Sequence, residues 1–112
     1  MGEVPESPTN SLAVRQLRTF AVQALAEQRL EDAVIALRQA VEMDPCLEWA
    51  WNDLGVVMEA LGNPREAMRC YRQALRVQPS HREAFSNLGL LTLQMDFAQA
   101  LRHQALTAVA GR

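Results

Sequence analysis

The sequence contains no lysine, because all 11 of its basic residues are arginine. A chain without lysine cannot form a Schiff base or supply the phosphate-binding lysine of a P-loop. The arginines are scattered along the chain, so we attribute the bias to codon or genome composition rather than to recognition of phosphates or carboxylates. With 13 acidic residues the formal net charge is −2, which excludes a polycation built as a whole for nucleic acid.

Cysteine and histidine are scarce, with two of each. Cys46 and Cys70 are 24 residues apart, a spacing that fits neither a zinc site nor a redox motif. His81 and His103 have no cysteine or carboxylate neighbours at a recurring metal-ligand spacing. We therefore expect no metal, two free thiols and a cytoplasmic location, because the N-terminus has no pattern of a secretion signal. An extracellular disulfide is the alternative.

Long hydrophobic runs and catalytic motifs are missing as well. The longest uncharged stretch, residues 84–95, contains five polar or glycine positions and is shorter than the roughly 18 apolar residues of a membrane span. No G-x-S-x-G, H-E-x-x-H, glycine-rich phosphate loop or EF-hand loop occurs. We expect neither an active site nor a cofactor, and hence a protein that is not an enzyme.

What is present is enough for one domain with a core: 112 residues, 49% of them hydrophobic. Residues 1–10 (MGEVPESPTN) hold two prolines and no apolar periodicity, and we expect a flexible leader there. From residue 11 to residue 112 apolar residues recur at intervals of three and four, as in Leu17, Phe20, Ala21 and Ala24. No segment alternates with a period of two, so this range is predicted to be an all-α domain.

Turn and capping signals divide these helices. Asn63-Pro64 followed by Glu66 reads as an N-cap, a first-turn proline and a capping-box glutamate, with Gly62 ending the preceding helix. Capping boxes are also predicted at Ser80–Glu83 and Asp96–Gln99, and Asp44-Pro45 has the pattern of a cap with a first-turn proline.

An internal repeat of 34 residues organises the chain. Two sets of three positions share this spacing: Leu17, Trp51 and Phe85, and then Ala21, Gly55 and Gly89. The middle block reads Trp51-x2-Leu54-Gly55, then Ala67-x3-Tyr71, then Pro79. This pattern resembles the tetratricopeptide repeat, with repeats at about residues 14–47, 48–81 and 82–112.

The resemblance implies a right-handed superhelix, an α-solenoid of three helical hairpins. Small residues such as Gly55 and Ala67 would lie where the two helices of a hairpin cross, and Trp51 and Tyr71 would fill the spaces beside them. The third block is atypical, since only 11 residues separate Gly89 from Ala100, one fewer than in the middle block. Either a residue is deleted before Asp96, or the 34-residue spacing holds to the end of the block. The block ends without a capping helix.

The concave surface of such a solenoid is formed by the first helix of each repeat. Helical spacing predicts that its groove is lined by ten residues: Arg15, Arg18, Val22, Trp49, Asn52, Asp53, Val56, Glu83, Asn87 and Leu90. Trp49 is either a binding anchor in this groove or extra core, whereas Trp51 takes the structural position. Asp53 and Glu59 form either an acidic spot or an ordinary solvated face.

Chaperone-binding members of the family clamp a C-terminal carboxylate with basic and amide side chains. Of the matching positions only Arg18 would serve, because Asp53 and Glu83 would repel a carboxylate, so we do not assign that function. Four arginines share one face of the predicted second helix of the middle hairpin: Arg65, Arg69, Arg72 and Arg76. We interpret them as a solvated convex face and expect no nucleic-acid partner.

The resemblance implies a non-catalytic scaffold or assembly adaptor that binds a protein, as a peptide or a helix, in the groove. The alternative is a regulatory or targeting domain cut from a larger enzyme. The last helix has more apolar residues than one hairpin can cover, and we expect a homodimer or a docked partner helix there. Four of its residues would form the interface: Leu101, Ala105, Leu106 and Val109.

Overall fold

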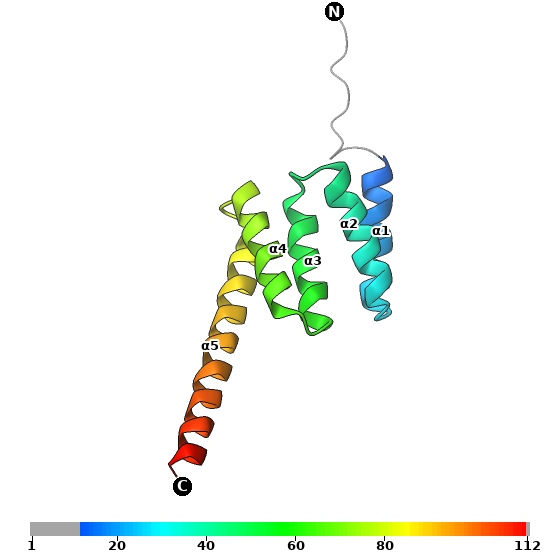
Figure 1. Cartoon of the computed structure of the whole chain (residues 1–112). Helices are drawn as coiled ribbons and strands as arrows, with labels where there is room; N and C mark the ends of the chain where they lie inside the picture. Colours follow the sequence, from blue (N-terminus) through cyan, green and yellow to red (C-terminus); the bar gives the residue numbers. More distant parts are fainter. Residues whose placement is uncertain (1–11, 112) are drawn as a thin grey trace, which may run out of the picture.

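The computed structural model describes residues 12–111, and this part of the chain is entirely helical and turn (Figure 1). It contains the helices α1 (Leu12–Ala26), α2 (Leu30–Met43), α3 (Glu48–Ala60), α4 (Pro64–Val77) and α5 (Arg82–Ala110). Helices α1 and α2 form one antiparallel hairpin and α3 and α4 a second, and α2 packs against α3 to join them. The predicted all-α solenoid is confirmed. The leader predicted over residues 1–10 lies outside the described residues.

The third block does not form the predicted hairpin. Helix α5 runs through 29 residues without a break, and its C-terminal half extends away from the hairpins (Figure 1). The first two hairpins turn at residues with positive φ, Gln28 at 59° and Gly62 at 78°. The third block is one residue short here and has neither glycine nor proline between Leu90 and Phe97, so nothing interrupts the helix. The helix start predicted at Asp96 is therefore wrong.

The sequence predicts the start of α4 more accurately than the starts of α3 and α5. Asn63 is the N-cap of α4, where its side-chain oxygen accepts a hydrogen bond from the Glu66 amide at 3.4 Å. Helix α5 is capped by His81 rather than Ser80, since the His81 Nδ1 accepts from the Ala84 amide at 3.1 Å. Asp44 is the C-cap of α2 rather than the N-cap of the next helix, and its carboxylate accepts a hydrogen bond from the Cys46 amide in the α2–α3 turn.

The core lies between the helices of each hairpin and between the hairpins, and small residues occupy the crossings. Ala21, Ala33, Ala40 and Ala67 are all buried, as the repeat predicts. Gly55 lies against the ring of Tyr71, which is fully buried, so the expected pairing of a small and a large residue is confirmed.

Two positions depart from that scheme. A side chain added at Gly89 would meet no atom within 4 Å, because no second helix of a third hairpin folds back over it. Trp51 is half-buried rather than fully buried, and its indole Nε1 donates to the Pro45 carbonyl at 2.8 Å.

Candidate functional site

The predicted groove is formed by residues of α1, α3 and α5, and burial divides them into three groups. Six are exposed, namely Arg15, Arg18, Val22, Val56, Glu83 and Leu90. Three are half-buried, namely Trp49, Asp53 and Asn87. Asn52 is buried and therefore does not line an open surface, contrary to the prediction.

Arg18 and Trp49 join the first two repeats across the groove. The guanidinium carbon of Arg18 lies 4.7 Å from the centroid of the Trp49 ring, a cation–π contact between α1 and α3. The other side of Trp49 packs against the hydrophobic core. Trp49 is thus half-buried, with one part packed on the core and the rest at the surface, and its role as a binding anchor stays a prediction.

Asn52 joins α3 to α5 through a chain of side-chain hydrogen bonds. Its Nδ2 donates to a carboxylate oxygen of Glu83 at 3.3 Å, and its Oδ1 accepts from Asn87 Nδ2 at 3.0 Å. A buried amide needs such partners, and both come from the next repeat. Helical spacing within one helix cannot show that Asn52 is covered by its neighbour, which is why the sequence placed it at the surface.

Asp53 is the carboxylate at the centre of the groove. Burial raises the pKa of Asp53 above its ordinary value, because desolvation penalises the charged form, and the nearby charge of Glu83 raises it further. Arg18 is the strongest opposing influence on this pKa, since its positive charge favours the ionised carboxylate. The groove therefore has arginine on α1 and two carboxylates, Asp53 and Glu83, on α3 and α5.

Glu59 is not part of this acidic region. Its carboxylate accepts a hydrogen bond from the hydroxyl of Tyr71, so it holds the aromatic ring that packs on Gly55. Burial raises the pKa of Tyr71, and the hydrogen bond to Glu59 raises it further, so the phenol stays protonated. The acidic pair suggested by the sequence is thus separated into a groove residue, Asp53, and a structural residue, Glu59.

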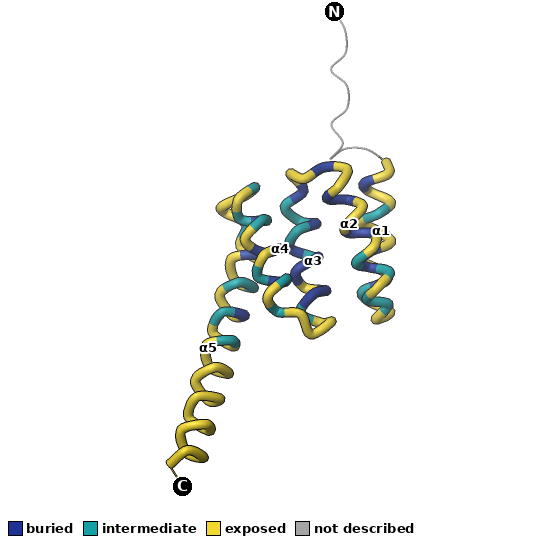
Figure 2. The backbone as a smooth tube through the Cα atoms, in the orientation of Figure 1, coloured by how far each residue is buried: buried dark blue, intermediate teal, exposed yellow. Residues whose placement is uncertain are grey.

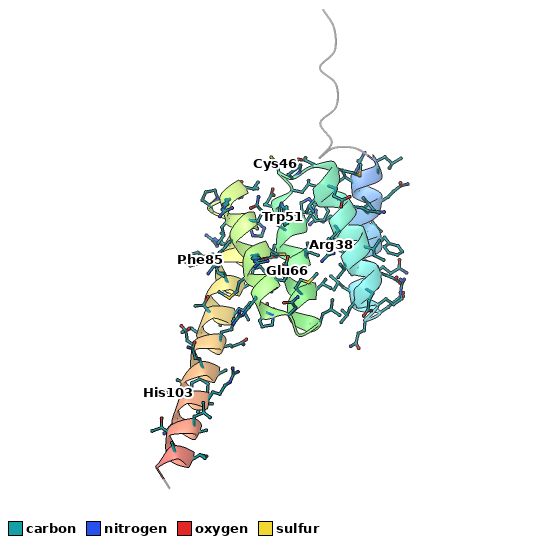
Figure 3. All side chains as sticks on the ribbon, in the orientation of Figure 1. Arg38, Cys46, Trp51, Glu66, Phe85 and His103 are labelled. Atoms are coloured by element: carbon teal, nitrogen blue, oxygen red, sulfur yellow. The ribbon has the colours of Figure 1, made fainter. Side chains whose placement is uncertain are left out.

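The arginine face on α4 is solvated, as expected. Arg65, Arg69, Arg72 and Arg76 are all exposed, and Arg69 forms an ion pair with Glu66 at 3.3 Å. One further contact has no signal in the repeat pattern: Arg29 stacks over Phe20 at 5.4 Å from the ring centroid. Of the two cysteines, which are both free, Cys46 is exposed at the α2–α3 turn (Figure 3) and Cys70 is buried.

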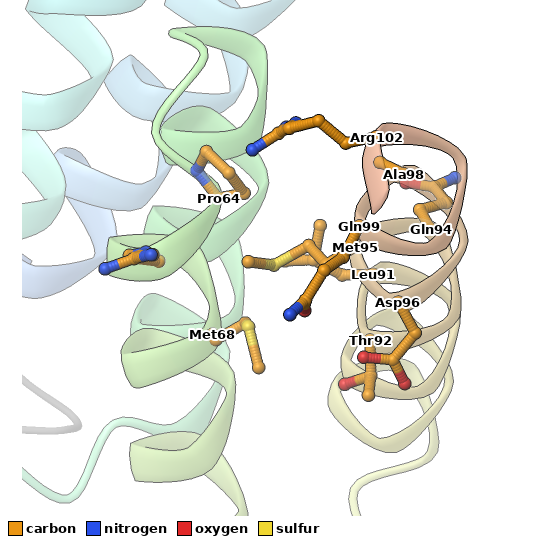
Figure 4. A pocket seen from close by; sticks show the side chains of 11 residues that line it. Pro64, Met68, Leu91, Thr92, Gln94, Met95, Asp96, Ala98, Gln99 and Arg102 are labelled. Carbon is orange, nitrogen blue, oxygen red and sulfur yellow. The ribbon is translucent and has the colours of Figure 1, made fainter. Parts of the chain in front are cut away.

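A hollow of about 650 Å³ lies between α4 and α5, and sequence reasoning did not predict it. Figure 4 shows Met68 of α4 opposite Leu91 and Met95 of α5 across this hollow. Pro64 and Arg102 lie at its end (Figure 4). It exists because α5 continues past the hairpins instead of turning back.

The four residues of the expected interface on the last helix are exposed. Leu101 is 50% exposed, Leu106 65% and Val109 67%, and Ala105 is also in the exposed class. Every residue from 96 to 110 is exposed (Figure 2). The structure thus shows an exposed apolar surface on this half of α5.

Two stacked hairpins with small residues at each crossing define a helical-repeat solenoid, a class of protein-interaction domain. The family model for the tetratricopeptide repeat matches residues 48–91. Together with the relatives and structures described below, this match shows that the protein is a tetratricopeptide repeat protein.

Three curated proteins are similar to this chain. The tetratricopeptide repeat-containing protein trd-1 of Caenorhabditis elegans is 31% identical over 75 residues, which are 67% of this chain and 10% of that protein. The N-terminal acetyltransferase A complex auxiliary subunit NAA15 of Arabidopsis thaliana is 36% identical over 67 residues, 60% of this chain and 8% of that protein. The probable biofilm formation methyltransferase WspC of Pseudomonas putida is 42% identical over 60 residues, 53% of this chain and 14% of that protein. The chain thus spans only a small part of each relative.

Solved structures agree in fold. The Sgt2 TPR domain of Aspergillus fumigatus superposes with a TM-score of 0.76 at 22% identity, over 86% of this chain and 64% of that one. The TPR2B-domain:pHsp70 complex of yeast Sti1 superposes with a TM-score of 0.74 at 16% identity, over 82% of this chain and 74% of that one. At residues 12–111 no helix is both long enough and apolar enough to cross a membrane.

Proposed function

We propose that this protein is a non-catalytic scaffold or assembly adaptor that binds a peptide or helix of a protein partner in the groove of α1, α3 and α5. The observation that carries the proposal is the arrangement of Arg18, Trp49 and Asp53. A half-buried aromatic ring lies beside a carboxylate whose charged form is disfavoured by burial, and a cationic partner group would relieve that cost. We also propose that the protein acts in the cytoplasm.

The charges of the groove favour a partner with a basic side chain. Asp53 and Glu83 present two carboxylates within one region, whose attraction for an arginine or lysine would be opposed chiefly by Arg18. Val56 and Leu90 are exposed apolar residues of the same groove, 39% and 57% exposed, and would contact an apolar residue of the partner. A C-terminal carboxylate, by contrast, would meet repulsion at Asp53.

A charge-scanned peptide array tests this proposal. We expect the full chain to retain peptides that carry arginine or lysine next to an apolar residue, and to lose them when the basic residue is replaced by glutamate. Asp53→Asn combined with Glu83→Gln should weaken binding about tenfold or more, since two ionic partners are removed. Arg72→Gln on the convex face is the matched control and should bind as the unchanged chain does. Binding that is indifferent to peptide charge would contradict the proposal.

The alternative is a regulatory or targeting domain of a longer enzyme. It is supported by the small share of each relative that the chain spans and by the methyltransferase named among them. The length of the natural open reading frame separates the two functions. A reading frame that continues into a catalytic domain would favour the alternative, and groove binding would then serve to place that domain.

A further inference from the structure

The hollow between α4 and α5 continues the hydrophobic core out to the surface. Leu91 of α5 is a buried core residue, and Met68 and Met95 pack against the same core from the two sides of the hollow (Figure 4). Its volume of about 650 Å³ is within the range of roughly 300–1,000 Å³ that is typical of ligand sites. Methionine side chains are flexible and polarisable, so they adapt to apolar groups of different shape. The hollow can therefore accept an apolar side chain.

Two arginines line this hollow, Arg65 on α4 and Arg102 on α5. Both are exposed, and within residues 12–111 neither of them forms an ion pair. The Arg102 side chain extends from α5 toward Pro64 at the end of the hollow (Figure 4), and Arg65 directly follows Pro64 in α4. Because a guanidinium group binds a carboxylate through two parallel, charge-assisted hydrogen bonds, this end of the hollow is suited to an acidic group.

Asp96 is the acidic residue of the lining, and it is separated from the two arginines. It precedes Arg102 by six residues, which is about 9 Å along the axis of α5. In Figure 4 the Asp96 side chain lies beside Thr92, toward the start of α5 and away from Arg102. Asp96 therefore leaves the positive charge at the Pro64 end of the hollow without a partner.

We propose that the hollow binds an acidic segment of a protein partner. An apolar side chain of that segment enters between Met68 and Met95, and carboxylates next to it pair with Arg65 and Arg102. The charge of this site is opposite to that of the groove of α1, α3 and α5, for which we propose a basic partner, and the two sites share no residue. The inference therefore goes beyond the proposed groove function and does not depend on it.

The two arginines would also attract a phosphate backbone, but the rest of the hollow favours a protein. Proteins that bind single-stranded nucleic acids stack the bases on aromatic side chains. Of the described residues that line the hollow none is aromatic, and its apolar part consists mainly of methionine and leucine. A buried apolar centre with charged groups at the rim, arginine among them, is typical of the interface between two proteins.

Selection from a random peptide library on the full chain tests the chemistry of the partner. We expect one class of enriched peptides to carry aspartate or glutamate next to a large apolar residue. Arg65→Gln combined with Arg102→Gln should weaken the binding of these peptides about tenfold or more, since both ionic partners are removed. Arg72→Gln combined with Arg76→Gln removes the same charge outside the hollow and should leave binding nearly unchanged. An equal loss in both double variants would overturn the site, as would a selection that enriches no acidic peptide.

Filling the hollow tests its apolar part without removing a core contact. Gln99→Trp places a large side chain in the lining and should abolish binding of the selected peptides, whereas Gln104→Trp, exposed on α5 outside the lining, should not. A bound peptide should also slow amide hydrogen exchange at residues 98–102, which are exposed in the free chain. Peptides that bind the Gln99→Trp variant as tightly as the unchanged chain would overturn the site. A single-stranded thymidine oligonucleotide that depends on Arg65 and Arg102 and binds more tightly than the peptides would overturn the assignment to a protein.

Discussion

Gly55 and Tyr71 meet at the centre of the second hairpin, where the Tyr71 ring occupies the space that any larger residue at position 55 would need. The hydroxyl of Tyr71 is bound to Glu59, so the ring is held at both ends and cannot turn aside at little cost. Position 55 is therefore glycine for a steric reason. Its backbone is ordinary α-helix and does not itself require glycine.

Gly55→Ala should lower the free energy of unfolding by about 1–3 kcal/mol, because the added methyl group overpacks the crossing. Chemical denaturation monitored by circular dichroism measures this change. The matched comparison is the same substitution in a Tyr71→Leu background, where the smaller side chain leaves room. An equal cost in both backgrounds would show that the ring is not the obstacle.

Trp49 and Trp51 should separate binding from stability. Both are half-buried, so Trp49→Ala and Trp51→Ala should each lower the free energy of unfolding by about 2 kcal/mol or more. Only Trp49→Ala should also weaken binding of a basic peptide, by about 2 kcal/mol, because Arg18 and Asp53 flank Trp49 and not Trp51. Titration calorimetry on the folded variants measures the difference. Equal binding by the two variants would exclude Trp49 as an anchor.

Asp53→Asn should stabilise the fold at neutral pH. The pKa of Asp53 is raised in the folded chain, so the unfolded chain ionises more readily and the charged carboxylate disfavours folding above its ordinary pKa of about 3.9. The contribution of Asp53 to stability is thus greatest at low pH and falls as pH rises through its folded pKa. Thermal unfolding at pH 3 and pH 7 should show a gain for Asp53→Asn only at the higher pH.

Asp96→Asn, at an exposed carboxylate of α5, is the matched control for that measurement and should change stability little at either pH. A gain for Asp53→Asn that is already complete at pH 3 would contradict the role of ionisation. If the same variant binds basic peptides less well, the groove carries a residue that costs stability and serves recognition, a trade that is common at binding sites.

The two thiols should differ sharply in reactivity. Burial raises the pKa of Cys70 to about 11, and the side chain is only 2% exposed, whereas Cys46 is exposed. Because the thiolate is the reactive form, the native chain should react promptly with Ellman's reagent at Cys46 alone. Unfolding in denaturant should release the second thiol. Cys46→Ser is the control, and prompt reaction of that variant under native conditions would show that α4 opens easily.

The sequence predicts the two hairpins well because their information is local and repeated. The 34-residue spacing, Asn63 at the helix start and Gly62 at the turn are each readable within a few residues. It fails at Asp96, whose capping pattern is present but lies in a block that is one residue short and lacks a turn residue. Because this segment lacks a turn residue, the helix continues there instead of turning.

The groove shows a second limit of sequence reasoning. Arg18, Trp49 and Asp53, which the helical period assigns to the groove, lie near one another on the neighbouring helices α1 and α3. The helical period cannot show that Asn52 is covered. The hydrogen-bond partners of Asn52 belong to α5 and lie 31 to 35 residues away along the chain. The periodic pattern predicts contacts within a repeat but leaves contacts between repeats undetermined.

The fully exposed second half of α5 has a consequence for folding. A helix segment of this length holds together weakly in water by its own propensity, and residues 96–110 are all exposed. Residues 96–110 would then fray, and their amide hydrogens would exchange rapidly with solvent, while the two hairpins stay protected.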